Sequence, residues 1–66
     1  MKVLVNATER EVAEGVTVID VLHELGAPPS GVAVALDGEV VPRASWARTV
    51  LHDGAAVEVL TAVQGG

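Results

Sequence analysis

One short segment carries every signal of a helix, and it divides the chain into two parts that lack such signals. In TVIDVLHELG, Thr17 can cap the first turn, and Asp20 stands three residues later in the reciprocal position of a capping box. Apolar residues follow the i, i+3, i+4, i+7 spacing of one helix face, at Val18, Val21, Leu22 and Leu25. Gly26 can take the left-handed conformation after a helix, and Pro28-Pro29 cannot continue it. The sequence therefore predicts one short helix, capped at both ends.

Short strands are predicted on both sides of this helix. Val3 to Val5 form an apolar run, and the turn-forming segment NATER leads to a second strand expected around Glu11 to Glu14, closed by Gly15. After the helix, VAVAL and EVV flank Asp37-Gly38, a pair that tolerates the positive backbone angles of a two-residue turn. These patterns indicate one hairpin before the helix and another after it.

The remaining segment is less regular. Pro42 lacks an amide proton, so it ends the fourth strand or places that strand at an edge of the sheet. A helical turn carrying Trp46, the sole aromatic residue, is expected between Arg43 and Leu51. Asp53-Gly54 then turns the chain into a last strand, from Val57 to about Ala62.

The order of elements predicts an α+β fold with one helix on one face of a mixed sheet of about five strands. If the helix is a right-handed crossover between the second and third strands, the first and last strands lie side by side in the centre of the sheet. This is the ubiquitin-like β-grasp arrangement. We expect a β-grasp domain over residues 1–62 and a flexible Gly-Gly tail over 63–66.

Alternation along the strands separates two faces of this sheet. The helix can cover only one face, for which the branched side chains are the natural partners, at Val3, Val5, Val34, Val57 and Val59. The opposite face then holds small or apolar residues where polar ones are usual, at Leu4, Ala33, Ala35, Leu60 and Ala62. Such a patch is a candidate docking surface. The alternatives are that loops or a second copy cover it, or that the alternation is displaced by one residue.

Composition excludes several classes of function. The net charge is −5, and the four basic residues are scattered, so no basic stripe for nucleic acid can form. The longest apolar run, Val32 to Leu36, is far shorter than the roughly 20 residues of a membrane span, and the N-terminus lacks the apolar centre of a secretory signal. A cytoplasmic protein is expected.

Groups for catalysis or metal binding are also missing from the sequence pattern. There is no cysteine, so neither a catalytic thiol nor a thiolate site exists. Neither His23 nor His52 has a second ligand at metal spacing, and the serines have no paired histidine and aspartate. We expect no metal site and no enzyme active site in this chain.

The α-carboxylate of Gly66 is the group that remains for covalent chemistry. A carboxylate is a poor electrophile, but transfer to the phosphate of AMP makes a mixed anhydride that a sulfur or nitrogen nucleophile can displace. An ATP site on a partner would be needed for this step. Glycines suit the position because they lack Cβ, can enter a narrow channel and leave the carbonyl open to attack.

Three stretches of the chain resemble the ThiS family of small sulfur-carrier proteins in thiamine biosynthesis. They are MKVLVN at the start, VAVALDGEVVPRASW from Val32 to Trp46, and LHDGAAVEVLTAVQGG at the end. The resemblance implies that an E1-like enzyme, ThiF, adenylates Gly66 with ATP, and that a sulfur donor such as a cysteine desulfurase converts it to a thiocarboxylate. Thiazole synthase, ThiG, then takes the sulfur. It also implies no intrinsic cofactor, and a flexible arm at Val63, Gln64 and Gly65.

Two positions depart from the usual pattern of the family. Asp37 stands where asparagine is common, and Ala56 stands where an acid often follows the Asp-Gly pair. Two alternatives to the thiamine carrier stay open. The chain could carry sulfur for another pathway, as the small subunit of molybdopterin synthase does, or it could be a non-covalent β-grasp interaction module.

Overall fold

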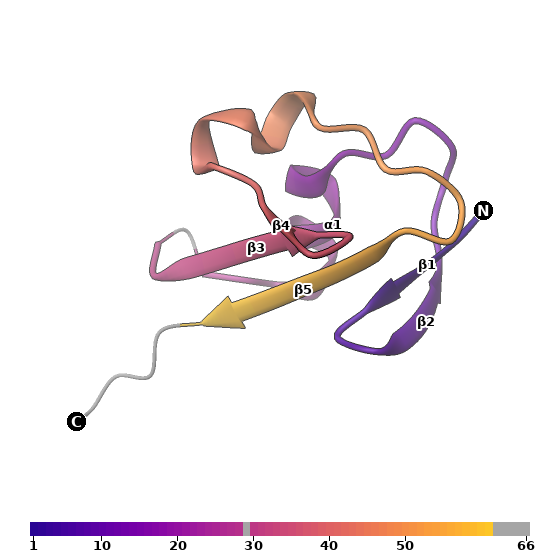
Figure 1. Cartoon of the computed structure of the whole chain (residues 1–66), viewed down its shortest axis with the longest axis horizontal. Coiled ribbons are helices and arrows are strands. Elements are labelled where there is room, and N and C mark those ends of the chain that lie inside the picture. Colours follow the sequence, from indigo (N-terminus) through magenta and orange to yellow (C-terminus); the bar gives the residue numbers. More distant parts are fainter. Residues whose placement is uncertain (29, 62–66) are drawn as a thin grey trace.

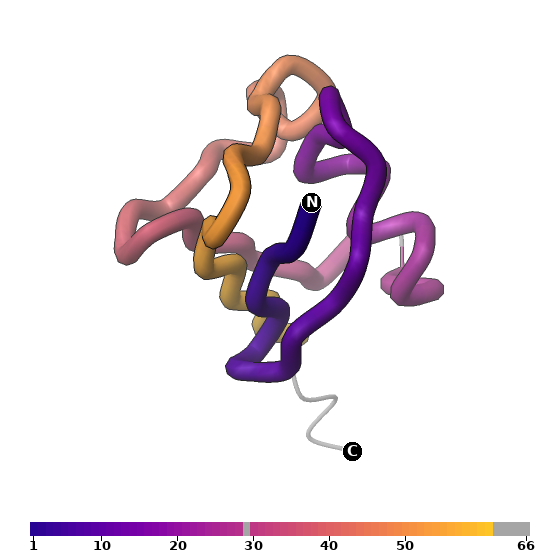
Figure 2. The backbone as a smooth tube through the Cα atoms, turned by 90° about the vertical axis from the view of Figure 1, so that its right-hand side faces the viewer, coloured from indigo at the N-terminus to yellow at the C-terminus, as the bar shows by residue number. Residues whose placement is uncertain are grey.

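The computed structural model describes residues 1–28 and 30–61, which form one mixed sheet with α1 and η1 on one side of it (Figures 1 and 2). The elements follow in the order β1 (Lys2–Val5), β2 (Thr8–Glu11), α1 (Val18–Leu25), β3 (Val32–Leu36), β4 (Glu39–Val40), the 3-10 helix η1 (Arg43–Arg48) and β5 (Ala56–Thr61). The strand order is β2-β1-β5-β3-β4. Strands β1 and β5 are parallel neighbours, whereas the other pairs are antiparallel. The predicted β-grasp fold, with the first and last strands side by side, is confirmed.

Both predicted caps of α1 are present. The Thr17 side chain accepts a hydrogen bond from the Asp20 amide at 3.4 Å, and the Asp20 carboxylate accepts one from the Thr17 amide at 3.0 Å. Gly26 has a φ of 69°, and its amide donates to the His23 carbonyl at 3.1 Å. The hydrogen bond from the Thr17 amide lowers the pKa of Asp20, because it stabilises the charged carboxylate.

The predicted position of the second strand was wrong. Strand β2 covers Thr8–Glu11 rather than the residues around Glu11 to Glu14. Asn6 and Ala7 both have positive φ, 50° and 68°, and make a two-residue turn that places Thr8 directly opposite Val5. Alanine rarely adopts this conformation, so the residue pattern does not predict so tight a hairpin.

The core lies between the sheet and the two helices. Four of the five valines predicted to face the helix are buried, namely Val3, Val5, Val34 and Val57, and Val59 is half-buried. They meet the apolar face of α1, whose buried residues are Val18, Val21 and Leu22. The face assignment made from strand alternation therefore agrees with the observed burial.

Trp46 closes the core from η1, in the segment where a helical turn was predicted. Its side chain is buried, and Nε1 donates a hydrogen bond to the Val41 carbonyl at 2.9 Å. The Arg43 guanidinium lies 5.8 Å from the centre of the Trp46 ring, within the range of a cation–π contact. The indole thus fills apolar space while its one polar group is satisfied.

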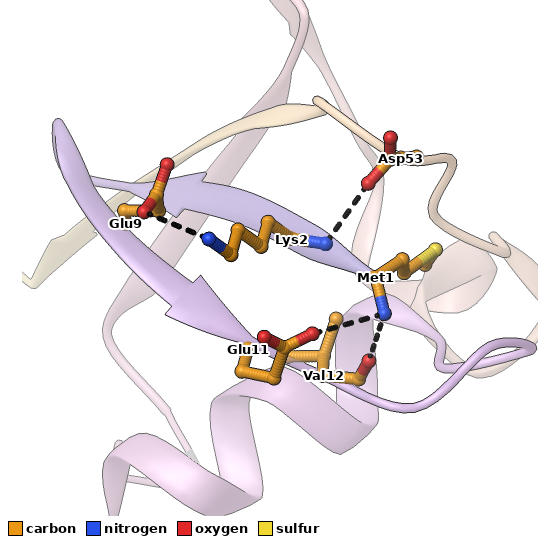
Figure 3. Close-up of polar contacts among 6 residues, drawn as sticks. All are labelled: Met1, Lys2, Glu9, Glu11, Val12 and Asp53. Carbon is orange, nitrogen blue, oxygen red and sulfur yellow. Dashed lines mark hydrogen bonds and ion pairs between the residues drawn. The ribbon is translucent and has the colours of Figure 1, made fainter.

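Polar contacts fix the first residues of the chain to two other segments (Figure 3). The Met1 ammonium donates to the Val12 carbonyl at 2.9 Å and lies 3.2 Å from a carboxylate oxygen of Glu11. The Lys2 amide donates to Oδ1 of Asp53 at 2.9 Å. Strand β1 is therefore joined both to β2 and to the loop that leads into β5.

Candidate functional site

The face of the sheet that turns away from α1, here called the outer face, carries the residues predicted for docking. Ala33 lies opposite Leu60 in the pairing of β3 with β5, and Leu4 lies beside Ala56 in the pairing of β1 with β5. The Leu4 and Leu60 side chains are 40% and 68% exposed. Ala33 is exposed and Ala35 is half-buried. These predicted residues thus share one open surface, while its use in docking stays a prediction.

Val40 extends the outer face and was missed by the sequence prediction. It lies opposite Ala35 across the β3–β4 hairpin and is 77% exposed. The signal was available, because a two-residue turn at Asp37-Gly38 sets Leu36 opposite Glu39 and therefore Ala35 opposite Val40.

Acidic side chains also lie on the outer face, with Glu9 on the edge strand β2 and Glu58 on the central strand β5. Glu9 lies opposite Leu4 on β2, and Glu58 lies opposite Ala35 on β5. Glu9 is also 3.7 Å from the Lys2 ammonium, an exposed pair that adds little stability (Figure 3). A partner for this face would be expected to offer apolar side chains with neutral or basic groups around them.

The predicted tail follows directly from β5. Ala62, Val63, Gln64, Gly65 and Gly66 lie outside the described residues, as does the predicted boundary between domain and tail. Strand β5 itself is described through Thr61 and lies between β1 and β3 in the sheet. The central strand of the fold is therefore the one that leads to the predicted reactive end.

Two side chains bond to the backbone of β5 from neighbouring turns. Oδ1 of Asn6 accepts a hydrogen bond from the Val59 amide at 2.8 Å, and its Nδ2 donates to the Val59 carbonyl at 3.2 Å. At the start of the strand, Oδ1 of Asp37 accepts from the Ala56 amide at 2.9 Å, and the Asp37 amide donates to the Ala56 carbonyl at 2.8 Å. The two positions that depart from the family pattern therefore touch each other.

Asp37 also contacts His52, which precedes β5. The other carboxylate oxygen, Oδ2, lies 2.6 Å from Nε2 of the imidazole, and Nδ1 lies 2.9 Å from the Asp53 carbonyl oxygen. The Ala56 amide and then the His52 ring lower the pKa of Asp37. The Asp37 hydrogen bond, followed by that to Asp53, raises the pKa of His52. These contacts fix the loop before β5 and leave the outer face open.

A hollow of about 490 Å³ lies on the outer face itself, with Leu4, Ala56 and Glu58 in its lining. A pocket of about 320 Å³ opens between α1 and η1, with Leu22 and Trp46 in its lining, on the opposite side of the sheet. Over residues 1–28 and 30–61, no group of three or more histidine, aspartate or glutamate side chains is placed to hold a metal ion. None of the helices in the described part of the chain is long and apolar enough to cross a membrane. The outer face and the end of β5 are therefore the candidate site.

A family profile and a known protein that are similar to this chain both carry the name ThiS. The profile of the ThiS family matches residues 3–66. The chain is 32% identical to the sulfur carrier protein ThiS of Escherichia coli over the whole length of both. It is 36% identical to a segment of the thiazole synthase of Paramagnetospirillum magneticum and spans 20% of that longer protein.

Solved structures agree in fold. The crystal structure of the thiamine biosynthesis protein ThiS from Geobacter metallireducens superposes with a TM-score of 0.83 at 36% identity, and each chain is covered completely. The solution structure of a thiamine biosynthesis protein from the same organism gives a TM-score of 0.82 and is covered to 88%. A match of the family profile over nearly all residues, together with these relatives, shows that this chain belongs to the ThiS family.

Proposed function

We propose that this chain is a sulfur carrier of thiamine biosynthesis and that Gly66 holds the sulfur as a thiocarboxylate. The observation that carries this proposal is the likeness to ThiS proteins over the whole chain, including the residues that end in Gly65 and Gly66. The fold adds a reason, because β5 is held in the centre of the sheet and leads to these residues. The chain would act as a protein cosubstrate rather than as a catalyst.

The proposed cycle uses the Gly66 carboxylate in two displacements. First, a carboxylate oxygen attacks the α-phosphorus of ATP, pyrophosphate leaves, and an acyl adenylate forms. Second, free sulfide, or the terminal sulfur of a donor persulfide, attacks the acyl carbon and AMP leaves; in the persulfide case a thiol then reduces the S–S bond of the acyl disulfide. One oxygen of the carboxylate is thereby replaced by sulfur. The ATP site would belong to an E1-like, ThiF-type partner, and the sulfur would come from a donor such as a cysteine desulfurase. The chain itself supplies the acid and the two glycines that leave it accessible.

Thiazole synthase is the proposed acceptor of the sulfur. In Paramagnetospirillum magneticum a protein with that name includes a segment similar to this whole chain. Joining the two in one polypeptide supports their working together, because a tether raises the effective concentration of one part around the other. We place the encounter in the cytoplasm and assign the contact with both enzymes to the outer face and to the tail at Val63, Gln64 and Gly65.

Charging of the purified chain tests the proposal. Incubation with a ThiF-type enzyme and ATP should release pyrophosphate, and addition of the sulfur donor should give the mass change for one oxygen replaced by sulfur at Gly66. A chain lacking Gly66 is the matched control and should give neither product. Equal charging of the truncated chain would show that the carboxylate of Gly66 is not the acceptor.

The choice of pathway needs a second measurement. The thiocarboxylate form should lose its sulfur when incubated with thiazole synthase and the precursors of the thiazole ring. Transfer to molybdopterin synthase instead would assign the carrier to the other pathway. A chain that is never charged, yet is retained by either enzyme, would be a non-covalent interaction module.

A further inference from the structure

The side chain of Asn6 takes the place of a strand residue beside β5. Strand β1 pairs with β5 only through Leu4 with Ala56 and Val5 with Val57. Beyond Val5 the chain turns away into the hairpin, but the carboxamide of Asn6 accepts from the Val59 amide and donates to the Val59 carbonyl. A carboxamide offers one acceptor and one donor in the same arrangement as a peptide group. The hydrogen bonding of β1 with β5 is thereby extended to Val59.

The conformation of Asn6 explains why asparagine suits this position. Its φ of 50° lies in the left-handed region, which asparagine enters more readily than most residues. Glycine would accept the same backbone but would leave both groups of Val59 without this partner. Aspartate would keep the acceptor but would bring a second oxygen against the Val59 carbonyl.

The contact lies where β5 has little other support. Val59 is half-buried, and the next two residues, Leu60 and Thr61, are exposed. On its other side, β3 pairs with β5 as far as Val32 opposite Thr61. Without the Asn6 side chain, the hydrogen bonds on the β1 side of β5 would end at Val57, whose carbonyl accepts from the Asn6 amide at 2.9 Å.

We propose that Asn6 is a positioning residue, which fixes the end of β5 at Val59, Leu60 and Thr61 for the encounter with the activating enzyme. This inference rests on the proposed carrier function. An end of β5 that is already fixed requires less ordering when the carrier binds an enzyme. Loss of the contact should therefore raise the KM of the activating enzyme for the carrier and leave kcat unchanged.

Asp37 provides a matched control for the experiment. It has the same φ of 50°, stands first in its own two-residue turn, and bonds through its side chain to β5 at the opposite end, at Ala56. The variants Asn6→Gly and Asp37→Gly each remove a side chain that bonds to the β5 backbone without straining the turn. Ala7→Gly controls for added freedom in the Asn6 turn.

Nuclear magnetic resonance on the full chain gives the first readout. In Asn6→Gly the Val59 amide should exchange with solvent about tenfold faster, as expected for loss of its hydrogen bond, and the order parameters of Leu60 and Thr61 should fall. Asp37→Gly and Ala7→Gly should leave both quantities unchanged. An unchanged exchange rate of the Val59 amide in Asn6→Gly would show that the Asn6 side chain does not hold β5, whether or not the chain is a carrier.

Kinetics of pyrophosphate release with a ThiF-type enzyme give the second readout, at temperatures where every variant is folded. Asn6→Gly should raise KM roughly fivefold to tenfold at constant kcat, whereas Asp37→Gly should match the unmodified chain. An equal KM for the two variants would overturn the positioning role. Absence of pyrophosphate release from the unmodified chain would instead contradict the proposed function. The magnetic resonance data would still show whether the Asn6 side chain holds the end of β5.

Discussion

Nε2 of the His52 imidazole lies 2.6 Å from Oδ2 of Asp37 and joins the β3–β4 turn to the loop before β5. The other ring nitrogen faces the Asp53 carbonyl oxygen at 2.9 Å. Because both nitrogens face oxygen atoms, only the doubly protonated imidazolium can donate to both. The contact therefore depends on pH.

The sign of this dependence follows from the two pKa shifts. The pKa of His52 is raised from 6.5, so its contribution to stability is complete below 6.5 and is lost as pH rises through the raised value. The pKa of Asp37 is lowered from 3.8, so its contribution is complete above 3.8 and is lost as pH falls through the lowered value. The contact between Asp37 and His52 therefore stabilises the fold most between pH 3.8 and pH 6.5.

Replacing His52 tests the upper limit of this range. His52→Gln should lower the midpoint of thermal unfolding at about pH 5 and should have a smaller effect at about pH 9, because the contribution of His52 is lost as pH rises through its raised pKa. An equal loss for His52→Gln at both pH values would contradict the charged contact.

Replacing Asp37 separates its two hydrogen bonds. Asp37→Asn removes the charge, while its side-chain oxygen can still accept from the Ala56 amide. The charge opposite His52 is lost, so the pKa of His52 should fall toward its ordinary value in a titration of the ring followed by magnetic resonance. A His52 pKa that does not move in this variant would show that Asp37 is not the cause of the shift.

The N-terminal cap of α1 gives a stability prediction. Thr17→Ala removes the oxygen that accepts from the Asp20 amide, and it should reduce the free energy of unfolding by about 1 kcal/mol in denaturant titrations. Thr17→Ser keeps the oxygen and should cost clearly less. Equal losses for the two variants would mean that the methyl group of Thr17, not its hydroxyl, stabilises the helix.

The outer face gives a prediction about partners. Leu60→Glu places a charge at an exposed site, so stability should change by no more than about 0.5 kcal/mol, while binding to the activating enzyme should weaken. Val50→Glu is the matched control, because Val50 is 58% exposed in the loop between η1 and β5. Similar affinities of the two variants for the enzyme, measured by calorimetry, would exclude Leu60 from the docking surface.

The sequence was sufficient for features that depend on neighbouring residues. The capping box of Thr17 with Asp20, the turn at Asp37-Gly38 and the inward alternation of the valines are all local patterns, and all three occur in the structure. The position of β2 failed because Ala7 adopts a positive φ that its side chain disfavours.

Contacts between distant segments could not be predicted in the same way. Asn6 and Val59 are 53 positions apart, and Asp37 and His52 are 15 apart. Asparagine and aspartate are common in solvent-exposed turns, so their presence at positions 6 and 37 does not indicate a partner. The partner is defined only by the sheet, which brings the two segments together. Alternation along each strand is enough to assign the exposed Leu4 and Leu60 to one face. It does not predict that the Asn6 side chain bonds to Val59 on β5.

The parallel pairing of β1 with β5 has a consequence for synthesis on the ribosome. Leu4 finds its neighbour Ala56 only after almost the whole chain has left the exit tunnel, so the centre of the sheet is the last part to close. Until then β1 can pair only with β2, and an isolated hairpin is at best marginally stable. The sheet therefore cannot close before β5 has been synthesised, and a nascent chain that stops before β5 lacks the centre of its fold.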